Sequence, residues 1–266
     1  MPTTYTHYRF GQDVKKGLPI EIQETINTNI DLFNIGLHGP DILFYYKPLT
    51  NNNIRKFGSF LHDQKSSIFF DKAAKIINSC SDSNNKDAAL SYILGFICHF
   101  TLDCEAHKYI EKKIAESTVN HYEIESEFDG YLLSKDNLDP TSTILTNHIK
   151  NNNIIDETIS MFYDNISSSD INKTLNSMVF YLNHLVVPSK MKRKFIYSLL
   201  NISGNSPLRG LIINYIPNPQ CKDSNEILMN IYNERIPKAV ELIINYCDVV
   251  NNNADLHLEF NRTFER

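Results

Sequence analysis

The segment from about residue 87 to residue 115 restricts the possible folds most strongly. Its apolar side chains recur at helical spacing, and it includes the mostly apolar run AALSYILGFICHFTLD. Similar spacing recurs along the chain, whereas the alternation of apolar and polar residues that is typical of strands is scarce. The sequence therefore predicts an all-α fold. The expected helices cover residues 20–34, 55–80, 87–115, 119–134, 142–165, 169–186, 189–201 and 224–250.

Short polar segments separate these helices. They include HGPD at 38–41, PNPQ at 217–220 and asparagine triplets at 51–53, 151–153 and 251–253, which we interpret as solvated loops. The sequence has no long flexible linker, and 42% of its residues are hydrophobic, so the chain can bury a substantial core. We therefore expect a single domain that spans residues 1–266.

The overall charge and the start of the chain limit its partners. The formal net charge is −5, so no global basic field attracts a phosphate backbone, which disfavours a dedicated nucleic-acid binder without excluding one. The first residues contain no apolar signal-peptide core, and no run approaches the roughly 18 apolar residues of a membrane span. We expect a cytoplasmic chain whose five cysteines, which form no CxxC pair, are free thiols.

Three residues with metal-binding side chains lie four positions apart within the apolar segment: His99, Asp103 and His107. On a helix, side chains at that spacing lie about 5–6 Å apart on one face. Zinc binds imidazole nitrogen and carboxylate oxygen at about 2.0–2.2 Å, so neighbours of this kind can hold it. A helical ion pair or a hydrogen-bonded core histidine is the alternative. The apolar surroundings favour the metal, because unpaired ionisable groups are costly to bury.

A second row follows in NHYEIESEFDGYLL. Here His121 and Glu125 have the same spacing, and Asp129 extends the row by one turn. Two helices that bear such rows and face each other would hold a pocket between them. We interpret Glu123 and Glu127, on the remainder of this helix, as part of a solvated face.

Three further residues complete a set that resembles a known family: His7 in THYRFGQD, Asp41 in GLHGPDILFYY and His62 in GSFLHDQ. In order and spacing, the set resembles the metal ligands of the bacterial zinc-dependent phospholipase C family. More remotely, it is similar to that of the fungal single-strand nucleases, which share the trinuclear zinc site. The resemblance covers about residues 1–135. The expected metal ligands are His7, Asp41, His62, His99, Asp103, His107, His121 and Glu125.

The resemblance implies a multi-helix bundle of the phospholipase C and zinc-nuclease type, with up to three zinc ions. One ion would lie among four ligands, which are Asp41, His62, His99 and Asp103. Asp103 would bridge this ion to a second one, which His7 would also bind. Helices from residues 136–266 would cover the part of the chain that bears the metals.

A third ion would lie among His107, His121 and Glu125, and the resemblance offers Asp41 as the general base in addition to its role as a ligand. The implied activity is that of an enzyme, the hydrolysis of a phosphodiester, with a phospholipid-like substrate. Two other functions stay open. One is a non-catalytic binding or regulatory domain that the metals stabilise, and the other is a single-strand nuclease.

The chain departs from the family's pattern at three places. Relatives complete the ion near the first histidine with the amine and carbonyl groups of a processed N-terminal residue, whereas this chain begins with Met1 and Pro2. The gap between Asp103 and His107 is short, and Lys108 stands where relatives often have proline. The altered start of the chain motivates the non-catalytic alternative.

Three features outside the ligand set have two interpretations each. His38 could support the site or contact phosphate, or it could be an ordinary loop histidine. Arg9 could meet a phosphate oxygen or be solvated. The basic segment SKMKRK at 189–194 could bind an anionic surface or begin a solvated helix. In the nearby turn, we expect the backbone freedom of Gly39 to help direct Asp41 inward.

Overall fold

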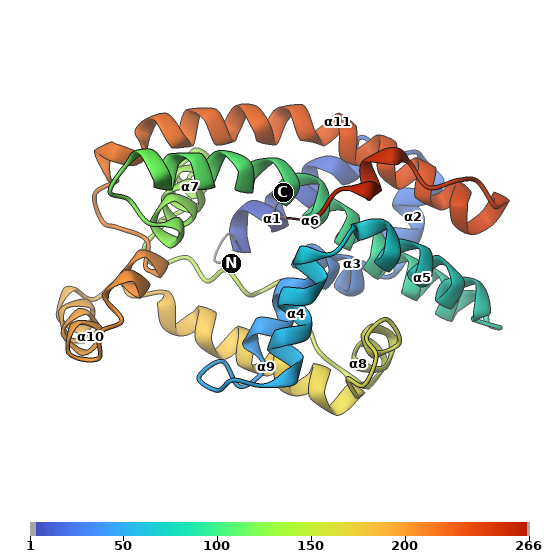
Figure 1. The fold of residues 1–266 in the computed structure, drawn as a ribbon, viewed down its shortest axis with the longest axis horizontal. Helices are drawn as coiled ribbons and strands as arrows, with labels where there is room; N and C mark the ends of the chain where they lie inside the picture. The colour runs from blue at the N-terminus through green and yellow to red at the C-terminus, as the bar shows by residue number, and fades with distance from the viewer. Residues whose placement is uncertain (1–3, 265–266) are drawn as a thin grey trace.

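The computed structural model describes residues 4–264, and these residues form helices and loops without any strand. The predicted all-α class is confirmed. The α-helices are α1 (Thr4–Lys16), α2 (Ile20–Thr28), α3 (Ile30–Gly36), α4 (Asn53–Asp63), α5 (Ser66–Ser79), α6 (Ser83–Glu116), α7 (His121–Lys135), α8 (Asn153–Ser160), α9 (Ser168–Leu185), α10 (Lys190–Ile202) and α11 (Lys222–Asn252) (Figure 1). Shorter 3-10 helices are η1 (Gly39–Tyr45), η2 (Ser206–Leu211), η3 (Pro219–Cys221) and η4 (Leu258–Asn261). Within the described part of the chain, no helix combines the length and apolar character that crossing a membrane requires.

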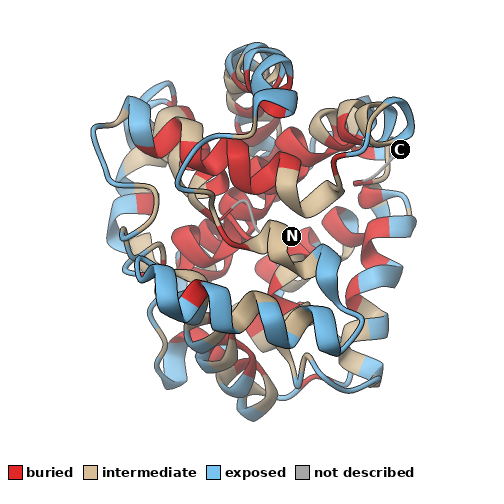
Figure 2. Cartoon of the chain, turned by 90° about the vertical axis from the view of Figure 1, so that its left-hand side faces the viewer, coloured by how far each residue is buried: buried red, intermediate tan, exposed pale blue. Residues whose placement is uncertain are grey.

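Helix α6 forms the centre of the fold. Every residue from Ala88 to Cys104 is buried, so this part of the helix has no solvent-exposed face. A helix that is apolar all round has to be covered on every side, and α1, α3, α5, α7, α8 and α11 all pack on it. Figure 2 shows the result, with buried residues in the middle of the molecule and exposed residues on the outer helices.

Helix α3 approaches α6 closely at Gly95. A Cβ atom at this position would lie 2.1 Å from the carbonyl oxygen of Phe33, which is too short for any side chain. Glycine therefore allows the two backbones to touch. Because α3 leads directly into η1, this contact also positions the segment that carries Asp41.

Two of the predicted helices are divided in the structure. Residues 20–34 form α2 and α3, which meet at Asn29, where φ is −120° and ψ is 37°. Residues 55–80 form α4 and α5, because the backbone of Gln64 is extended and ends α4. In both cases the apolar spacing continues across the break, so periodicity alone does not reveal it.

Helix α1 has no counterpart among the predicted helices. Its buried face combines Phe10 and Val14 with polar side chains, among them Thr6 and His7. The polar residues on the inner face weaken the apolar periodicity on which the prediction depended.

The helix predicted at 142–165 is wrong over most of its length. The chain forms a loop there, and α8 begins only after Asn152, whose side chain accepts a hydrogen bond from a backbone N–H of the first helical turn. Asn52 caps α4 in the same way, and Asn253 ends α11 in the left-handed conformation. The asparagine triplets therefore mark the ends of helices, which agrees with the preference of asparagine for caps.

The later helices enclose the earlier ones. In Figure 1, α11 lies along one side of the molecule, α9 along the opposite side and α10 at one end. α11 packs on α1, α6 and α7, and α9 packs on α8 and η1. A common hydrophobic cluster includes residues from near both ends of the chain, such as Phe10 and Phe264. The organisation as a single domain stays a prediction.

Candidate metal centre

Helix α6 carries His99, Asp103 and His107 on one face, and all three side chains are buried. His99 Nε2 lies 3.1 Å from Asp103 Oδ2, and His107 Nε2 lies 3.8 Å from the same oxygen. The spacing of four residues thus places one carboxylate between two imidazoles.

Helix α1 brings His7 to the other oxygen of the same carboxylate. His7 Nε2 lies 3.1 Å from Asp103 Oδ1, and the ring centroids of His7 and His99 are 4.4 Å apart. One ligand atom from each of these three residues lies within 4.8 Å of the others. The two oxygens of Asp103 therefore face two different imidazoles.

Asp129 of α7 holds α1 in this position. Its Oδ1 atom accepts a hydrogen bond of 2.8 Å from the backbone N–H of Thr6 and another from the Thr6 hydroxyl group, and its Oδ2 atom accepts one from the backbone N–H of Tyr5. Asp129 was expected to extend the row of His121 and Glu125, but it binds the first turn of α1 instead. The expected departure of the chain at its first two residues lies outside the described residues 4–264.

The segments η1 and α4 contribute Asp41 and His62. His62 Nε2 lies 3.0 Å from Asp41 Oδ1. His62 Nδ1 lies 2.8 Å from the carbonyl oxygen of Gly58. Because a carbonyl only accepts, Nδ1 donates this hydrogen bond, which turns Nε2 toward the site, as is usual for metal-binding histidines. Asp41, His62 and His99 form a second group of ligand atoms within 4.8 Å of one another.

Gly39 makes room for His99 beside this group. Its φ of +48° lies in the left-handed region that favours glycine. A Cβ atom on Gly39 would lie 2.3 Å from the His99 ring. The expected turn is confirmed, and the close approach of the ring gives a second reason for glycine at this position.

Helix α7 supplies the remaining two residues. It begins at His121, after Asn120 caps it by accepting a hydrogen bond of 3.0 Å from the backbone N–H of Glu123. His121 Nε2 lies 3.0 Å from Glu125 Oε1, and His107 Nε2 lies 3.8 Å from the same oxygen. His107, His121 and Glu125 form the third group within 4.8 Å. Since His107 also neighbours Asp103 on α6, the three groups are continuous.

Several nitrogens of the site make no hydrogen bond within the described residues. These buried atoms are His7 Nδ1 and both ring nitrogens of His99. His99 Nε2 lies near Asp103, but not in the geometry of a hydrogen bond. A buried polar atom without a partner costs about 1–3 kcal/mol, and a metal ion would satisfy such a nitrogen. Imidazole nitrogen and carboxylate oxygen are ligands that zinc takes, so the residues fit a zinc centre.

The carboxylates of the site are ionised although they are largely buried. Burial by itself would raise their pKa values, but the neighbouring imidazoles outweigh it. His62 holds the pKa of Asp41 below its ordinary value, and His99 and His107 hold that of Asp103 well below it. The pKa of Glu125 falls to about 2, where a hydrogen bond from His121 opposes burial. In return, Asp41 outweighs burial and raises the pKa of His62 to about 9.

A pair of histidines beside the site was not predicted. His38 Nε2 lies 2.8 Å from His148 Nε2, and the ring of His148 stacks on Tyr8 at 4.2 Å. Burial lowers the pKa of both histidines, that of His148 to about 3. Both rings are therefore neutral, and the Nε2–H group of one ring donates a hydrogen bond to the Nε2 atom of the other. His148 lies in the loop before α8, so no periodic spacing could have revealed its position.

Two other polar residues have partners that the sequence did not indicate. Arg9 forms an ion pair with Asp136, with 2.6 Å between its Nε atom and Oδ2. Glu127 was expected on a solvated face, but it is buried. It accepts hydrogen bonds from the Asn214 side chain and the Asn218 backbone, of 2.7 and 3.0 Å. The loop after η2 covers this face of α7, which explains why the prediction was wrong.

Comparison with known proteins agrees with this arrangement. The family model described as zinc dependent phospholipase C matches residues 6–182, which include every expected ligand from His7 to Glu125. The match covers more than half of the 266 residues, so the chain belongs to the zinc-dependent phospholipase C family, and the resemblance inferred from the sequence is confirmed. The same comparisons found no matching curated protein and no matching solved structure. Residues 183–266 lie beyond the family match.

Proposed function

We propose that this protein is a zinc-dependent phosphodiester hydrolase that acts on a phospholipid-like substrate. The position of Asp103 carries the proposal. Its two oxygens each lie 3.1 Å from a different imidazole, that of His7 and that of His99. Such a carboxylate is placed to bridge two metal ions, an arrangement that suits the in-line displacement of phosphate esters.

The assignment of ligands follows the three groups of side chains. Asp41, His62 and His99 would hold one ion, and Asp103 would contribute to it and join it to a second ion at His7. A separate set would hold a third ion, namely His107, His121 and Glu125. When bound, zinc supplies the acidity that makes water a nucleophile near neutral pH and the positive charge that stabilises a phosphoryl group.

Asp41 is placed to act as the general base. Of the three carboxylates its side chain is the most accessible, at 13% exposed, compared with 6% for Asp103 and 2% for Glu125. One oxygen of Asp41 faces His62, and its lowered pKa keeps the group ionised at neutral pH. A base must lie within about 2.6–3.2 Å of the proton donor, directly or through one water.

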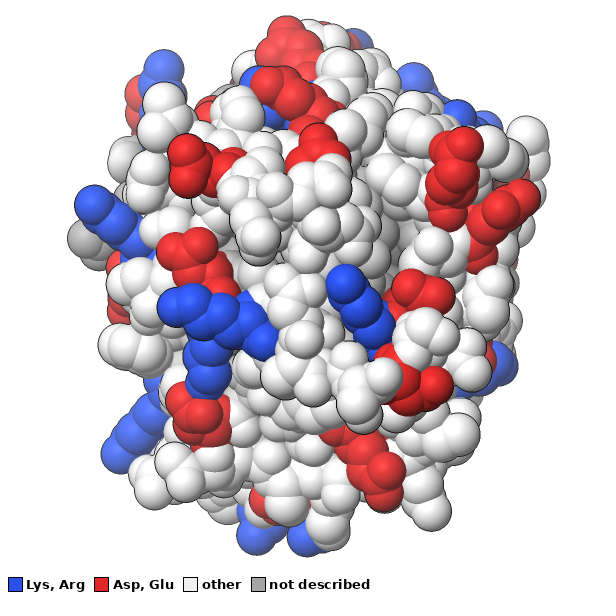
Figure 3. Space-filling view, turned by 90° about the vertical axis from the view of Figure 1, so that its right-hand side faces the viewer, with Lys and Arg blue, Asp and Glu red and all other residues white. Residues whose placement is uncertain are grey.

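A phospholipid-like substrate agrees better with the chain than a polynucleotide does. The family is described by a phospholipase activity. Proteins usually bind a polynucleotide through a continuous basic surface. Here the net charge is −5. Figure 3 shows lysine and arginine interspersed with acidic residues on one face of the molecule.

The test combines metal analysis with turnover. Protein prepared without chelator should contain zinc and hydrolyse a chromogenic phosphodiester and phosphatidylcholine, and a chelator should abolish both reactions. Asp41→Asn should lower turnover about 100- to 10,000-fold, the range of a lost general base. Asp87→Asn, which alters an exposed carboxylate of α6, should have no effect. Metal analysis of Asp41→Asn separates a lost base from a lost ligand.

Other outcomes would support the other functions. Zinc-loaded protein that melts at a higher temperature than metal-free protein, but hydrolyses no phosphodiester, would indicate a metal-stabilised binding domain and contradict the proposal. Preferential cleavage of single-stranded DNA would indicate a nuclease.

A further inference from the structure

Helix α10 exposes an unusual number of large apolar side chains. Met191 is 84% exposed, Phe195 64%, Leu199 50% and Ile202 85%. The neighbouring Ile216 is 81% exposed. Single exposed apolar residues are common on protein surfaces, but a contiguous group of them usually marks an interaction site.

The four apolar residues of the helix form one stripe. Their spacing of four, four and three residues places them on a single face, since a helix turns about 100° per residue. Lys190, Lys192 and Lys194 are exposed on either side of this stripe near its beginning. Arg193 points the opposite way and is buried. The helix therefore presents an apolar stripe with flanking lysines to solvent.

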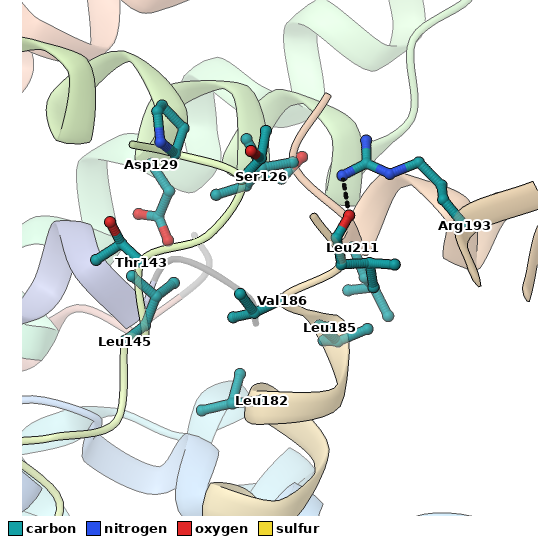
Figure 4. A pocket seen from close by; sticks show the side chains of 13 residues that line it. Ser126, Asp129, Thr143, Leu145, Leu182, Leu185, Val186, Arg193 and Leu211 are labelled. Carbon is teal, nitrogen blue, oxygen red and sulfur yellow. Dashed lines mark hydrogen bonds between the residues drawn. The ribbon is translucent and has the colours of Figure 1, made fainter. Parts of the chain in front are cut away.

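Arg193 fixes this orientation. Its guanidinium group donates a hydrogen bond of 3.0 Å to the carbonyl oxygen of Val187 and lies 3.9 Å from the ring centroid of Tyr215. Figure 4 shows Arg193 at one end of a small pocket that Asp129 of α7 also lines. These contacts keep the stripe facing outward. Because Arg193 and Asp129 line the same pocket, they also place α10 near α7, the helix that bears His121 and Glu125.

We propose that α10 is a lipid-binding helix that lies in the interface of a bilayer containing anionic lipid. Helices of this kind bury an apolar face at the boundary between headgroups and acyl chains. Lysines beside the apolar face extend toward the headgroups while their methylene stems cover apolar surface. The local excess of positive charge on a chain of net charge −5 gives the helix the sign that an anionic surface attracts.

A second copy of this chain fits the stripe less well. Parallel two-fold pairing of α10 would bring the flanking lysines of both copies together, and like charges that close repel one another. Antiparallel pairing would leave these lysines without a negative partner on the other copy's α10, because the helix contains no acidic residue. A lipid surface satisfies the apolar stripe and the lysines together. The inference extends the proposed function, because such a surface would contain its substrate, but binding to lipid can be measured without turnover.

The experiment measures co-sedimentation with vesicles of phosphatidylcholine alone and of equal parts phosphatidylcholine and phosphatidylglycerol. The full chain should bind the anionic vesicles more tightly, and added salt should weaken this binding. Replacing the three lysines that flank the stripe, Lys190, Lys192 and Lys194, by glutamine should lower the partition coefficient about 100-fold. Each of them contributes roughly fivefold near an anionic surface. The matched control replaces three exposed lysines elsewhere, Lys56, Lys75 and Lys112, and should bind as the original chain does.

A second variant tests the apolar stripe, with Phe195→Ser, Leu199→Ser and Ile202→Ser. Binding to both kinds of vesicle should fall at least tenfold. Its control replaces exposed apolar residues of other segments, Ile20, Leu49 and Ile68, by serine and should bind normally. Hydrolysis of a chromogenic phosphodiester in solution should be unchanged in all four variants.

Two results would overturn the inference. One is equal binding by the stripe variants and their controls. The other is a concentration-dependent dimer that the serine variant abolishes, because this would make the stripe a contact between copies. If the chain binds vesicles through α10 but hydrolyses no phosphodiester, the proposed function fails and this inference stands.

Discussion

The central helix α6 and the outer helix α10 depart from the usual distribution of residues in opposite ways. α6 buries His99, Asp103 and His107 in the middle of the molecule, whereas α10 exposes apolar side chains such as Phe195 and Ile202. Buried ionisable groups and exposed apolar patches are both unfavourable for folding alone. Each departure therefore indicates something that the protein binds: metal ions in the first case and a lipid surface in the second.

Removal of the metal should give the largest effect, and it should affect the region around α6 but not α10. If ions satisfy the buried imidazoles, a chelator should lower the melting temperature by roughly 10 °C or more, because zinc binding contributes folding free energy directly. Hydrogen exchange should increase in α1, α6 and α7 and stay unchanged in α10. Zinc should restore the stability. Equal melting temperatures with and without metal would contradict the expectation.

Loss of the shared carboxylate should be nearly as severe. Asp103→Asn should lower phosphodiester hydrolysis at least about 1,000-fold, because it weakens the ligand shared by two ions. Glu111→Gln changes an exposed carboxylate on the same helix and should leave the rate unchanged. Steady-state kinetics together with zinc content provides the measurement. Full zinc content with normal turnover in Asp103→Asn would show that Asp103 is not a ligand of the metal centre.

The close approach of α3 to α6 should also be sensitive to substitution. Gly95→Ala would place a methyl group 2.1 Å from the Phe33 carbonyl oxygen, and overpacking of this kind should lower the free energy of unfolding by about 3 kcal/mol. Asn84→Ala, at the exposed start of α6, should change it by less than about 0.5 kcal/mol. Urea denaturation measures both. An unchanged free energy of unfolding in Gly95→Ala would show that α3 and α6 can move apart without loss of stability.

The smallest effect concerns the pH dependence of stability. Burial raises the pKa of Asp129 to about 7, although hydrogen bonds from Thr6 and Tyr5 oppose the shift. Between the ordinary value near 4 and pH 7, the folded protein therefore retains a proton that the unfolded chain releases. Stability should fall as pH rises through this range, by at most about 1.4 kcal/mol for each pH unit, which is the limit for a single titrating group.

Asp129→Asn tests this contribution. The amide oxygen can still accept hydrogen bonds from Thr6, but the group no longer titrates. Urea denaturation at pH 5 and pH 8 should show that the original chain loses more stability than the variant at the higher pH. A difference between the two proteins that does not change with pH would contradict the raised pKa.

The sequence predicts the parts of the centre that depend on helical spacing. The rows on α6 and α7 follow from positions four residues apart, which a helix places side by side. His7, Asp41 and His62 come from separate segments, and only the resemblance to a family connected them with the rows. Their convergence depends on packing between helices, which spacing along the chain does not encode.

The failures of sequence reasoning have a common physical cause. Helix α1 buries polar residues that serve the site, so its apolar periodicity is weak. Glu127 is covered by a loop that begins more than 80 residues later, and His148 reaches His38 from a segment without regular structure. In each case a long-range contact, rather than a local preference, decides the environment of the residue.

The position of Asp103 among the imidazoles of His7, His99 and His107 has a consequence for metal uptake. An ion held by His7 and an ion held by His99 would share this one carboxylate, so occupancy of one position would change the affinity of the other. A stepwise titration with zinc would reveal such coupling as a departure from independent binding.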